Sequence, residues 1–270
     1  EGQMYALSQL PFARLFKNPS LVACVVALAT MVEFGTADDL QSKTPDISAL
    51  LEQFDEMYES KGSTAQMEIK IVKPGKTRTM RLRAWGKGSD RELIVIEAPT
   101  RDAGTATLKV ENNLWNYLPK IARTIRVPPS MMMGSWMGSD FTNDDLVRRV
   151  SYKDDYTHKL LPAEESESDW KVRLIAKPDI PGLWSRVEVV FSVENRLPVQ
   201  VQYFDRKDRL ARTMRFDDVK RIDGRLVPTM MTIVPERDEG HYTEMRYLEI
   251  DFNADVDDGM FSLSRLERRR

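Results

Sequence analysis

Hydrophobic and polar residues alternate along most of the chain from Thr64 onward, which is the period of strands that bury one face. Met67, Ile69 and Ile71 alternate with charged or polar neighbours, and the runs around Met80 and Tyr203 follow the same rule. Turn-forming residues separate these runs, for example Pro74-Gly75 and Asp223-Gly224. The pattern predicts an antiparallel meander over residues 64–127 and a second series of longer strands over residues 170–252.

Two stretches have helical spacing instead. In the first, Thr44 is the predicted N-cap and Lys61-Gly62 the predicted end. Its apolar residues fall on one side of the helix: Ile47, Leu50, Leu51, Phe54, Met57 and Tyr58. The second is a short helix that begins at Thr142, with Asp145 three residues later, as in a capping box.

No repeat, low-complexity tract or linker interrupts the pattern, so we expect a single domain over residues 38–270. A long antiparallel sheet twists and curls rather than staying flat. The apolar stripes of the two helices need a surface to cover. The predicted fold class is therefore mainly β with a few helices: a curled antiparallel sheet that forms a half-open barrel covered by lid helices.

Residues 1–37 have the pattern of a secretory signal peptide. Basic Arg14 and Lys17 precede the apolar run 21–32, and Gly35-Thr36-Ala37 supplies small residues for cleavage. The run of about 12 residues is shorter than the roughly 20 that span a bilayer. We expect cleavage after Ala37 and a periplasmic mature protein.

Lipidation at Cys24 is an alternative that the sequence disfavours, because only Leu21-Val22-Ala23 of the apolar run precede this cysteine. Cys24 is the only cysteine in the chain, and cleavage after Ala37 removes it. The mature protein would then contain neither a disulfide nor a cysteine nucleophile.

Composition and motifs point away from several function classes. The net charge of -2 with both signs intermixed argues against a nucleic-acid partner. His158 and His241 are the only histidines, and neither a zinc-protease motif nor a Gly-x-Ser-x-Gly elbow is present. The acids near residues 140–145 do not have calcium-loop spacing. We therefore predict no catalytic residue, metal or cofactor, although a pair of carboxylates for glycoside chemistry stays open.

The stretch from Met131 to Asp145 combines four methionines and a tryptophan with two glycines. Methionine is flexible and polarizable, and proteins use it where a surface must fit variable apolar partners. The segment therefore either contacts apolar cargo or packs in the core. The candidate cavity and lid residues are Met131, Met132, Met133, Trp136 and Met137, together with Trp85, Trp115 and Tyr117 from the predicted strands. For the aromatic residues in strands, ordinary core packing is the competing interpretation.

Two motifs add a family resemblance. Trp115-Asn116-Tyr117-Leu118-Pro119 is followed, in fixed order, by Gly138-Ser139-Asp140-Phe141-Thr142. Together they resemble the LolA-like family of outer-membrane lipoprotein-sorting proteins, over nearly the whole mature chain. The resemblance implies a half-open barrel with a helical lid, a periplasmic location and a cavity for acyl chains. Residues 134–136 look like an insertion relative to the family pattern.

The resemblance also implies partners and leaves function alternatives open. It implies lipid or lipoprotein cargo and an inner-membrane exporter of the resistance-nodulation type, and we expect a monomer. The first hypothesis is a periplasmic carrier. The second is a periplasmic sensor or adaptor that binds a membrane protein, with lipid as a modulator. The third, a hydrolase, lacks a recognisable motif.

Overall fold

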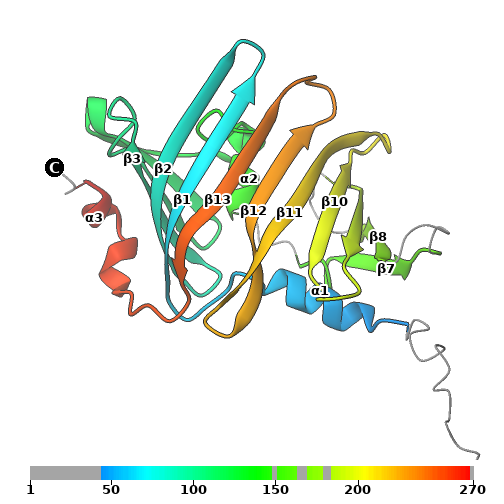
Figure 1. Ribbon diagram of the computed structural model, residues 1–270. Helices are drawn as coiled ribbons and strands as arrows, with labels where there is room; N and C mark the ends of the chain where they lie inside the picture. The colour runs from blue at the N-terminus through cyan, green and yellow to red at the C-terminus, as the bar shows by residue number, and fades with distance from the viewer. Residues whose placement is uncertain (1–43, 148–150, 163–168, 179–183, 268–270) are drawn as a thin grey trace, which may run out of the picture. The chain divides into compact units, whose positions relative to one another are not determined.

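The computed structural model describes residues 44–147, 151–162, 169–178 and 184–267, which belong to one compact unit. The predicted signal peptide lies outside these residues. Within them, 13 strands form one antiparallel sheet that is not closed into a barrel (Figure 1). The predicted fold class is confirmed.

The strands form two meanders that meet in the middle of the sheet. The first runs β1 Ser63–Lys73, β2 Lys76–Lys87, β3 Arg91–Ala98, β4 Ala106–Val110, β5 Asn113–Leu118 and β6 Arg123–Arg126. The second runs β7 Tyr156–Leu160, β8 Trp170–Ala176, β9 Arg186–Phe191, β10 Pro198–Phe204, β11 Leu210–Ile222, β12 Arg225–Pro235 and β13 Tyr242–Asp251. β1 pairs with β13, so β6 and β7 are the two edges.

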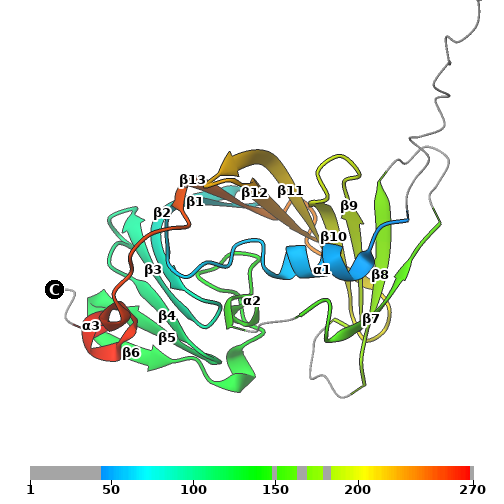
Figure 2. The same ribbon diagram turned by 90° about the horizontal axis from the view of Figure 1, so that it is seen from below.

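This strand order requires the chain to run from one edge of the sheet to the other. Residues 127–155, here called the crossing segment, connect edge strand β6 to the opposite edge strand β7. The segment contains η2 Pro129–Met131 and α2 Asn143–Val147. Seen from below, the sheet curves around α1 Ile47–Asp55 and α2, which both lie inside the curve (Figure 2).

Helix α1 is shorter than the sequence predicted. Asp46, not Thr44, is the N-cap, and its carboxylate accepts a hydrogen bond from the Ala49 N–H at 3.1 Å. The predicted end at Lys61 was also wrong, because α1 ends at Asp55. Met57 and Tyr58 still pack against the core from the connection that follows. At the end of this connection Gly62 is required, since a Cβ atom there would lie 2.3 Å from the Ala254 carbonyl oxygen.

The inner, concave face of the sheet holds the main core. Residues from seven neighbouring strands form one continuous row across it: Ile71, Thr243, Ile233, Met214, Val201, Val189 and Val172. Leu50, Leu51 and Phe54 of α1 pack on this face. The alternation of the strands therefore places methionine and aliphatic side chains inside the curve.

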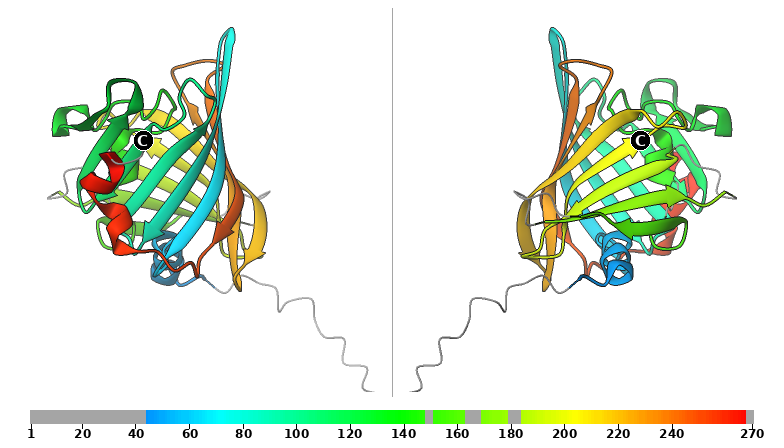
Figure 3. Two further views of the ribbon diagram at one scale, coloured as in Figure 1. Left: turned by 90° about the vertical axis from the view of Figure 1, so that its left-hand side faces the viewer. Right: turned by 90° about the vertical axis from the view of Figure 1, so that its right-hand side faces the viewer.

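The outer face of β3–β5 is also apolar, and the C-terminal residues cover it. Leu93, Val95 and Leu108 pack there against Phe261 and Leu266. These two residues belong to η3 Asp258–Phe261 and α3 Leu263–Glu267, which lie outside the curve next to this half of the sheet (Figure 3, left). A short η1, Pro119–Ile121, joins β5 to β6.

Candidate functional site

The crossing segment is bound to the sheet through several polar contacts, the most buried of which is made by Trp136. The Trp136 side chain is 3% exposed, and its Nε1–H donates to the Thr107 hydroxyl on β4 at 3.0 Å. The Thr107 hydroxyl donates in turn to Asn116 Oδ1 on β5. This chain satisfies polar groups that burial would otherwise leave unpaired.

Two further contacts bind the turn that follows Trp136. Arg78 on β2 donates from its guanidinium to the Met137 carbonyl oxygen at 2.8 Å and forms an ion pair with Asp102 at 2.9 Å. Thr243 on β13 donates to the Asp140 carboxylate at 2.6 Å and accepts from the Asp140 N–H at 2.9 Å. Strands from both meanders therefore bind the crossing segment.

The fourth contact is an ion pair between α2 and β11. Arg212 is 6% exposed, and two of its nitrogens donate to the two Asp145 oxygens at 2.7 and 2.6 Å. The guanidinium lies over the rings of Tyr203, at 4.5 Å, and Trp184, at 4.8 Å. Burial alone would raise the pKa of Asp145, but the hydrogen bonds and charge of Arg212 outweigh it, and this pKa is lowered.

Helix α2 begins with the predicted capping box. The Thr142 N–H donates to the Asp145 carboxylate at 2.8 Å, and the Asp145 N–H donates to the Thr142 hydroxyl at 3.1 Å. The same carboxylate therefore caps the helix and binds Arg212. The prediction for this helix start is confirmed.

The later part of the crossing segment is bound to α1. The Asp55 carboxylate accepts hydrogen bonds from the Tyr152 N–H at 2.9 Å and the Lys153 N–H at 3.2 Å. The Tyr152 ring stacks on Phe54 with centroids 4.9 Å apart, and its hydroxyl lies 3.1 Å from that of Tyr203. Because Tyr203 also contacts Arg212, these residues form one network from α1 to α2.

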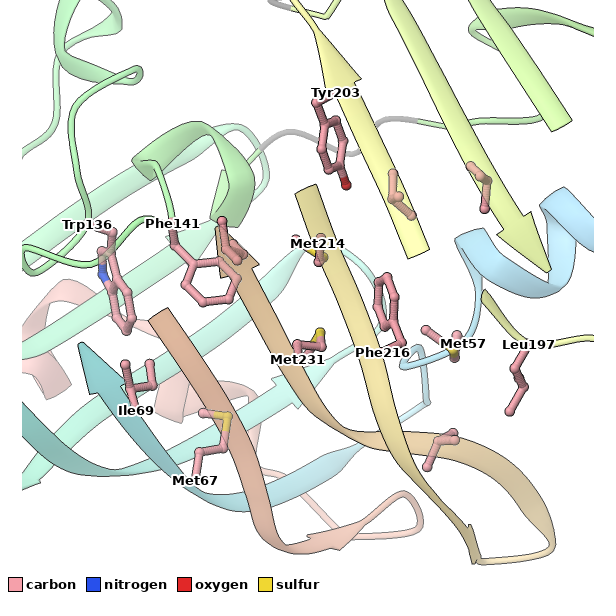
Figure 4. Close-up of a cluster of buried hydrophobic side chains, with 14 of the residues drawn as sticks. Met57, Met67, Ile69, Trp136, Phe141, Leu197, Tyr203, Met214, Phe216 and Met231 are labelled. Carbon is pink, nitrogen blue, oxygen red and sulfur yellow. The ribbon is translucent and has the colours of Figure 1, made fainter. Parts of the chain in front are cut away.

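Between the two helices lies a continuous apolar cluster (Figure 4). Trp136 and Phe141 lie at one end, Met57 and Leu197 at the other, with Met231 among the side chains between them. An open groove of about 760 Å³ lies at the Met57 end. Met57, Leu197 and Leu226 border it, but most of its lining residues are polar or charged, among them Glu56 and Arg225. The apolar interior thus extends from this groove to the crossing segment.

The structure divides the eight predicted site residues between the two faces of the sheet. Trp136 and Met137 pack against the main core, and Met132 packs on a small cluster of Leu114 and Val127. Met131 and Met133 are exposed.

Trp85, Trp115 and Tyr117 lie on the outer face, in the cluster that contains Phe261 and Leu266. Tyr117 is buried there and the two tryptophans are half-buried. The sheet itself therefore separates these three aromatic residues from Trp136. Ligand binding by any of the eight residues stays a prediction.

Sequence reasoning missed the residues that bind the crossing segment: Arg78, Thr107, Arg212 and Thr243. A signal was present for three of them. Arg78, Arg212 and Thr243 each stand two positions before a methionine that faces the main core, namely Met80, Met214 and Met245. A polar residue on the apolar side of an alternating strand requires a buried partner.

The described residues contain no group of three or more His, Cys, Asp or Glu side chains that could hold a metal ion. Within the same residues, no helix has both the length and the apolar character needed to cross a membrane.

The fold and the covered inner face define the class: a curled, half-open antiparallel sheet of the LolA type. A family model with the description "uncharacterized protein" matches residues 88–268. With this match and the structural neighbours, the chain belongs to a LolA-like family, as its motifs predicted. No curated protein matches the chain.

Three solved structures illustrate the likeness of the fold. A DUF1329 family protein from Desulfovibrio piger has 24% identity and a TM-score of 0.73, over 81% of this chain and 97% of that one. A putative outer membrane lipoprotein-sorting protein domain from Vibrio parahaemolyticus has 21% identity and a TM-score of 0.70, over 82% and 98%. A LolA superfamily protein from Nitrosomonas europaea has 20% identity and a TM-score of 0.66, over 80% and 97%.

Proposed function

We propose that this protein is a periplasmic carrier that shelters a lipid, or the acyl chains of a lipoprotein, against the inner face of its sheet during transfer toward the outer membrane. The crossing segment acts as the lid in this proposal. The observation that carries it is the continuous apolar cluster between the groove near Met57 and the crossing segment. The lipoprotein-sorting description of the Vibrio domain supports the same function.

The composition of the inner face suits a variable apolar cargo. Met67, Met80, Met214 and Met231 lie there beside Ile69 and Ile233. Unbranched thioether side chains repack around different shapes at little cost. An acyl chain could therefore insert without requiring one fixed cavity shape.

The contacts of the crossing segment suit a lid that opens and closes again. They are hydrogen bonds and one ion pair from separate strands, together with the apolar contacts of Trp136 and Phe141 in the core. Each hydrogen bond contributes about 1 kcal/mol net, whereas each buried methylene contributes about 0.8 kcal/mol. Trp136 and Phe141 add about 2–3 kcal/mol each. An acyl chain of about 16 methylenes, with about 13 kcal/mol, would therefore outweigh the contacts broken on opening, and their re-formation would favour release.

Native mass spectrometry of the protein purified from the periplasm tests this proposal. We expect lipid to co-purify with the wild-type protein and to be lost from Met231→Gln, because Met231 is buried on the inner face. The matched control is Met230→Gln. Met230 is the preceding residue, and its sulfur accepts a hydrogen bond from Arg246 instead of facing the main core. Thermal unfolding would establish that both variants are folded.

Two outcomes would contradict the carrier. A wild-type protein free of lipid that captures one membrane protein would identify the adaptor, the second hypothesis. Equal lipid content in both methionine variants would mean that the inner face does not bind the cargo. We also expect an exporter of the resistance-nodulation type among proteins crosslinked to the carrier in cells.

A further inference from the structure

Exposed hydrophobic side chains gather in one short part of the chain. Among the described residues, ten large hydrophobic side chains are exposed, and four of these ten lie between positions 121 and 133. They are Ile121 (55% exposed), Ile125 (46%), Met131 (60%) and Met133 (44%). Singly scattered exposed hydrophobics need no explanation, but four within 13 residues of the chain make this segment a candidate interaction surface.

The same stretch carries only positive charge. Lys120, Arg123 and Arg126 are exposed, and no acidic residue occurs from Asn112 to Ser139. This composition contrasts with the chain as a whole, whose net charge is -2. In the next part of the crossing segment, the Asp140 and Asp145 carboxylates already bind Thr243 and Arg212.

The backbone places these residues at the rim of the sheet. Residues 119–133, here called the edge segment, comprise η1, edge strand β6 and η2. Ile125 pairs with Asn116 and points to the same side of the sheet as Val127, two residues later. Met132 packs on the cluster that contains Val127. The exposed Ile125 side chain therefore lies on the side of β6 where the loop of three methionines folds back.

We propose that the edge segment docks on the surface of a lipid bilayer that contains anionic lipids. Ile121, Ile125, Met131 and Met133 would enter the boundary between headgroups and acyl chains, and the three basic side chains would bind lipid phosphates. This surface is distinct from the inner face that the carrier proposal assigns to cargo. Docking therefore does not require that cargo is bound.

The edge segment shares residues 127–133 with the lid and is hydrogen-bonded to α2. The Asn143 side-chain amide of α2 donates to the Met131 carbonyl oxygen at 3.1 Å, and the Asp144 N–H donates to the Met132 carbonyl oxygen at 2.8 Å. Insertion of Met131 and Met133 into a bilayer would pull on these two hydrogen bonds. The membrane would thus act on α2 at the place where cargo is received or delivered.

Vesicle flotation with protein purified from the periplasm tests the docking surface. The probes are vesicles of pure phosphatidylcholine and of phosphatidylcholine with about 30% phosphatidylglycerol. We expect binding to the anionic vesicles only, weakening strongly when the salt rises from about 0.1 to 0.5 M. Arg123→Gln/Arg126→Gln should bind about tenfold or more weakly, and Met131→Ser/Met133→Ser should lose a similar factor.

The matched controls change equally exposed residues elsewhere. Leu248→Ser and Lys220→Gln alter exposed side chains on β13 and β11 and should bind within about twofold of the wild type. Three outcomes would overturn the proposal: no vesicle binding by the wild type, equal binding to neutral and anionic vesicles, or equal losses in the controls. Crosslinking of the edge segment to a protein without vesicle binding would assign it to a protein partner instead. If the carrier proposal is wrong, native mass spectrometry will show no bound lipid, whereas vesicle binding can still be observed.

Discussion

Three polar residues on the inner face of the sheet have apolar neighbours, and each is hydrogen-bonded to the crossing segment. Arg78, Arg212 and Thr243 bind Met137, Asp145 and Asp140, in that order. A charge or hydroxyl buried among methionines costs several kcal/mol unless it is hydrogen-bonded. The crossing segment supplies those partners for Arg212 and Thr243, whereas Arg78 also has its ion pair with Asp102. Displacement of the segment would leave Arg212 and Thr243 without these partners, which favours its return.

The Asp145–Arg212 pair gives a prediction for stability against pH. The pKa of Asp145 is lower in the folded protein than its usual value of about 3.9. A lowered folded pKa stabilises the protein above the unfolded pKa, and this stabilisation disappears as the pH falls through the folded pKa. We expect Asp145→Asn to lower the free energy of unfolding by about 2 kcal/mol at pH 7.

Urea unfolding of both proteins between pH 7 and pH 3 measures this difference. It should stay constant down to about pH 5 and shrink below about pH 4. A difference that is the same at pH 3 and pH 7 would show that the charge of Asp145 is not what stabilises the fold.

At the scale of elements, α2 depends on its surroundings. A helix of five residues has no stability by itself, since nucleation costs more than so few hydrogen bonds return. Its capping box, its bond to Arg212 and the hydrogen bonds from Asn143 and Asp144 to the methionine loop hold it in place. Helix, loop and sheet therefore form and open together.

Removal of the N-cap tests this dependence. Thr142→Ala should lower the free energy of unfolding by about 1 kcal/mol and speed hydrogen exchange of the amides of residues 136–146. Thr142→Ser keeps the hydroxyl and is the matched control, with stability close to that of the wild type. If Thr142→Ala and Thr142→Ser have the same free energy of unfolding and the same exchange rates, the hydrogen bond of the Thr142 hydroxyl does not stabilise α2.

At the scale of the whole protein, the crossing segment is a consequence of strand order. Pairing of β1 with β13 puts β6 and β7 at opposite edges, so the chain between them runs from one edge to the other, and its residues Trp136 and Phe141 pack on the inner face. The same order leaves β6 without a partner on one side, where the edge segment carries its basic and apolar residues. One topological choice thus produces both the lid and the proposed membrane contact.

The periplasmic location is a prediction from residues 1–37, and processing of this segment can be measured directly. We expect the exported protein to begin at Asp38, as found by intact mass and N-terminal sequencing. Ala37→Leu should block cleavage because the peptidase requires a small residue there. Cys24→Ala should leave the processed mass unchanged, whereas a mature protein that begins at a lipid-modified Cys24 would overturn the prediction.

Strand alternation and helix-capping patterns predicted the first meander and the start of α2 correctly, but not the bounds of α1. The meander predicted over residues 64–127 is formed by β1–β6, which run from Ser63 to Arg126, and Thr142 with Asp145 forms the predicted capping box. The start of α1 was wrong because Thr44 and Asp46 can both cap a helix, and sequence alone does not choose between them. Its end was wrong because Met57 and Tyr58 reach the core without being helical.

The sequence by itself determined which residues of a strand share a face, because side chains alternate with a period of two whatever the strand pairs with. It also determined the LolA-like family through its motifs. Only the tertiary structure decided which face is concave and what covers each face. Trp115 and Trp136 look alike in sequence, yet Trp115 packs on the outer face with the C-terminal residues, and Trp136 packs into the core on the inner face. That assignment depends on the pairing of β1 with β13, residues nearly a whole domain apart, and no local pattern specifies such a contact.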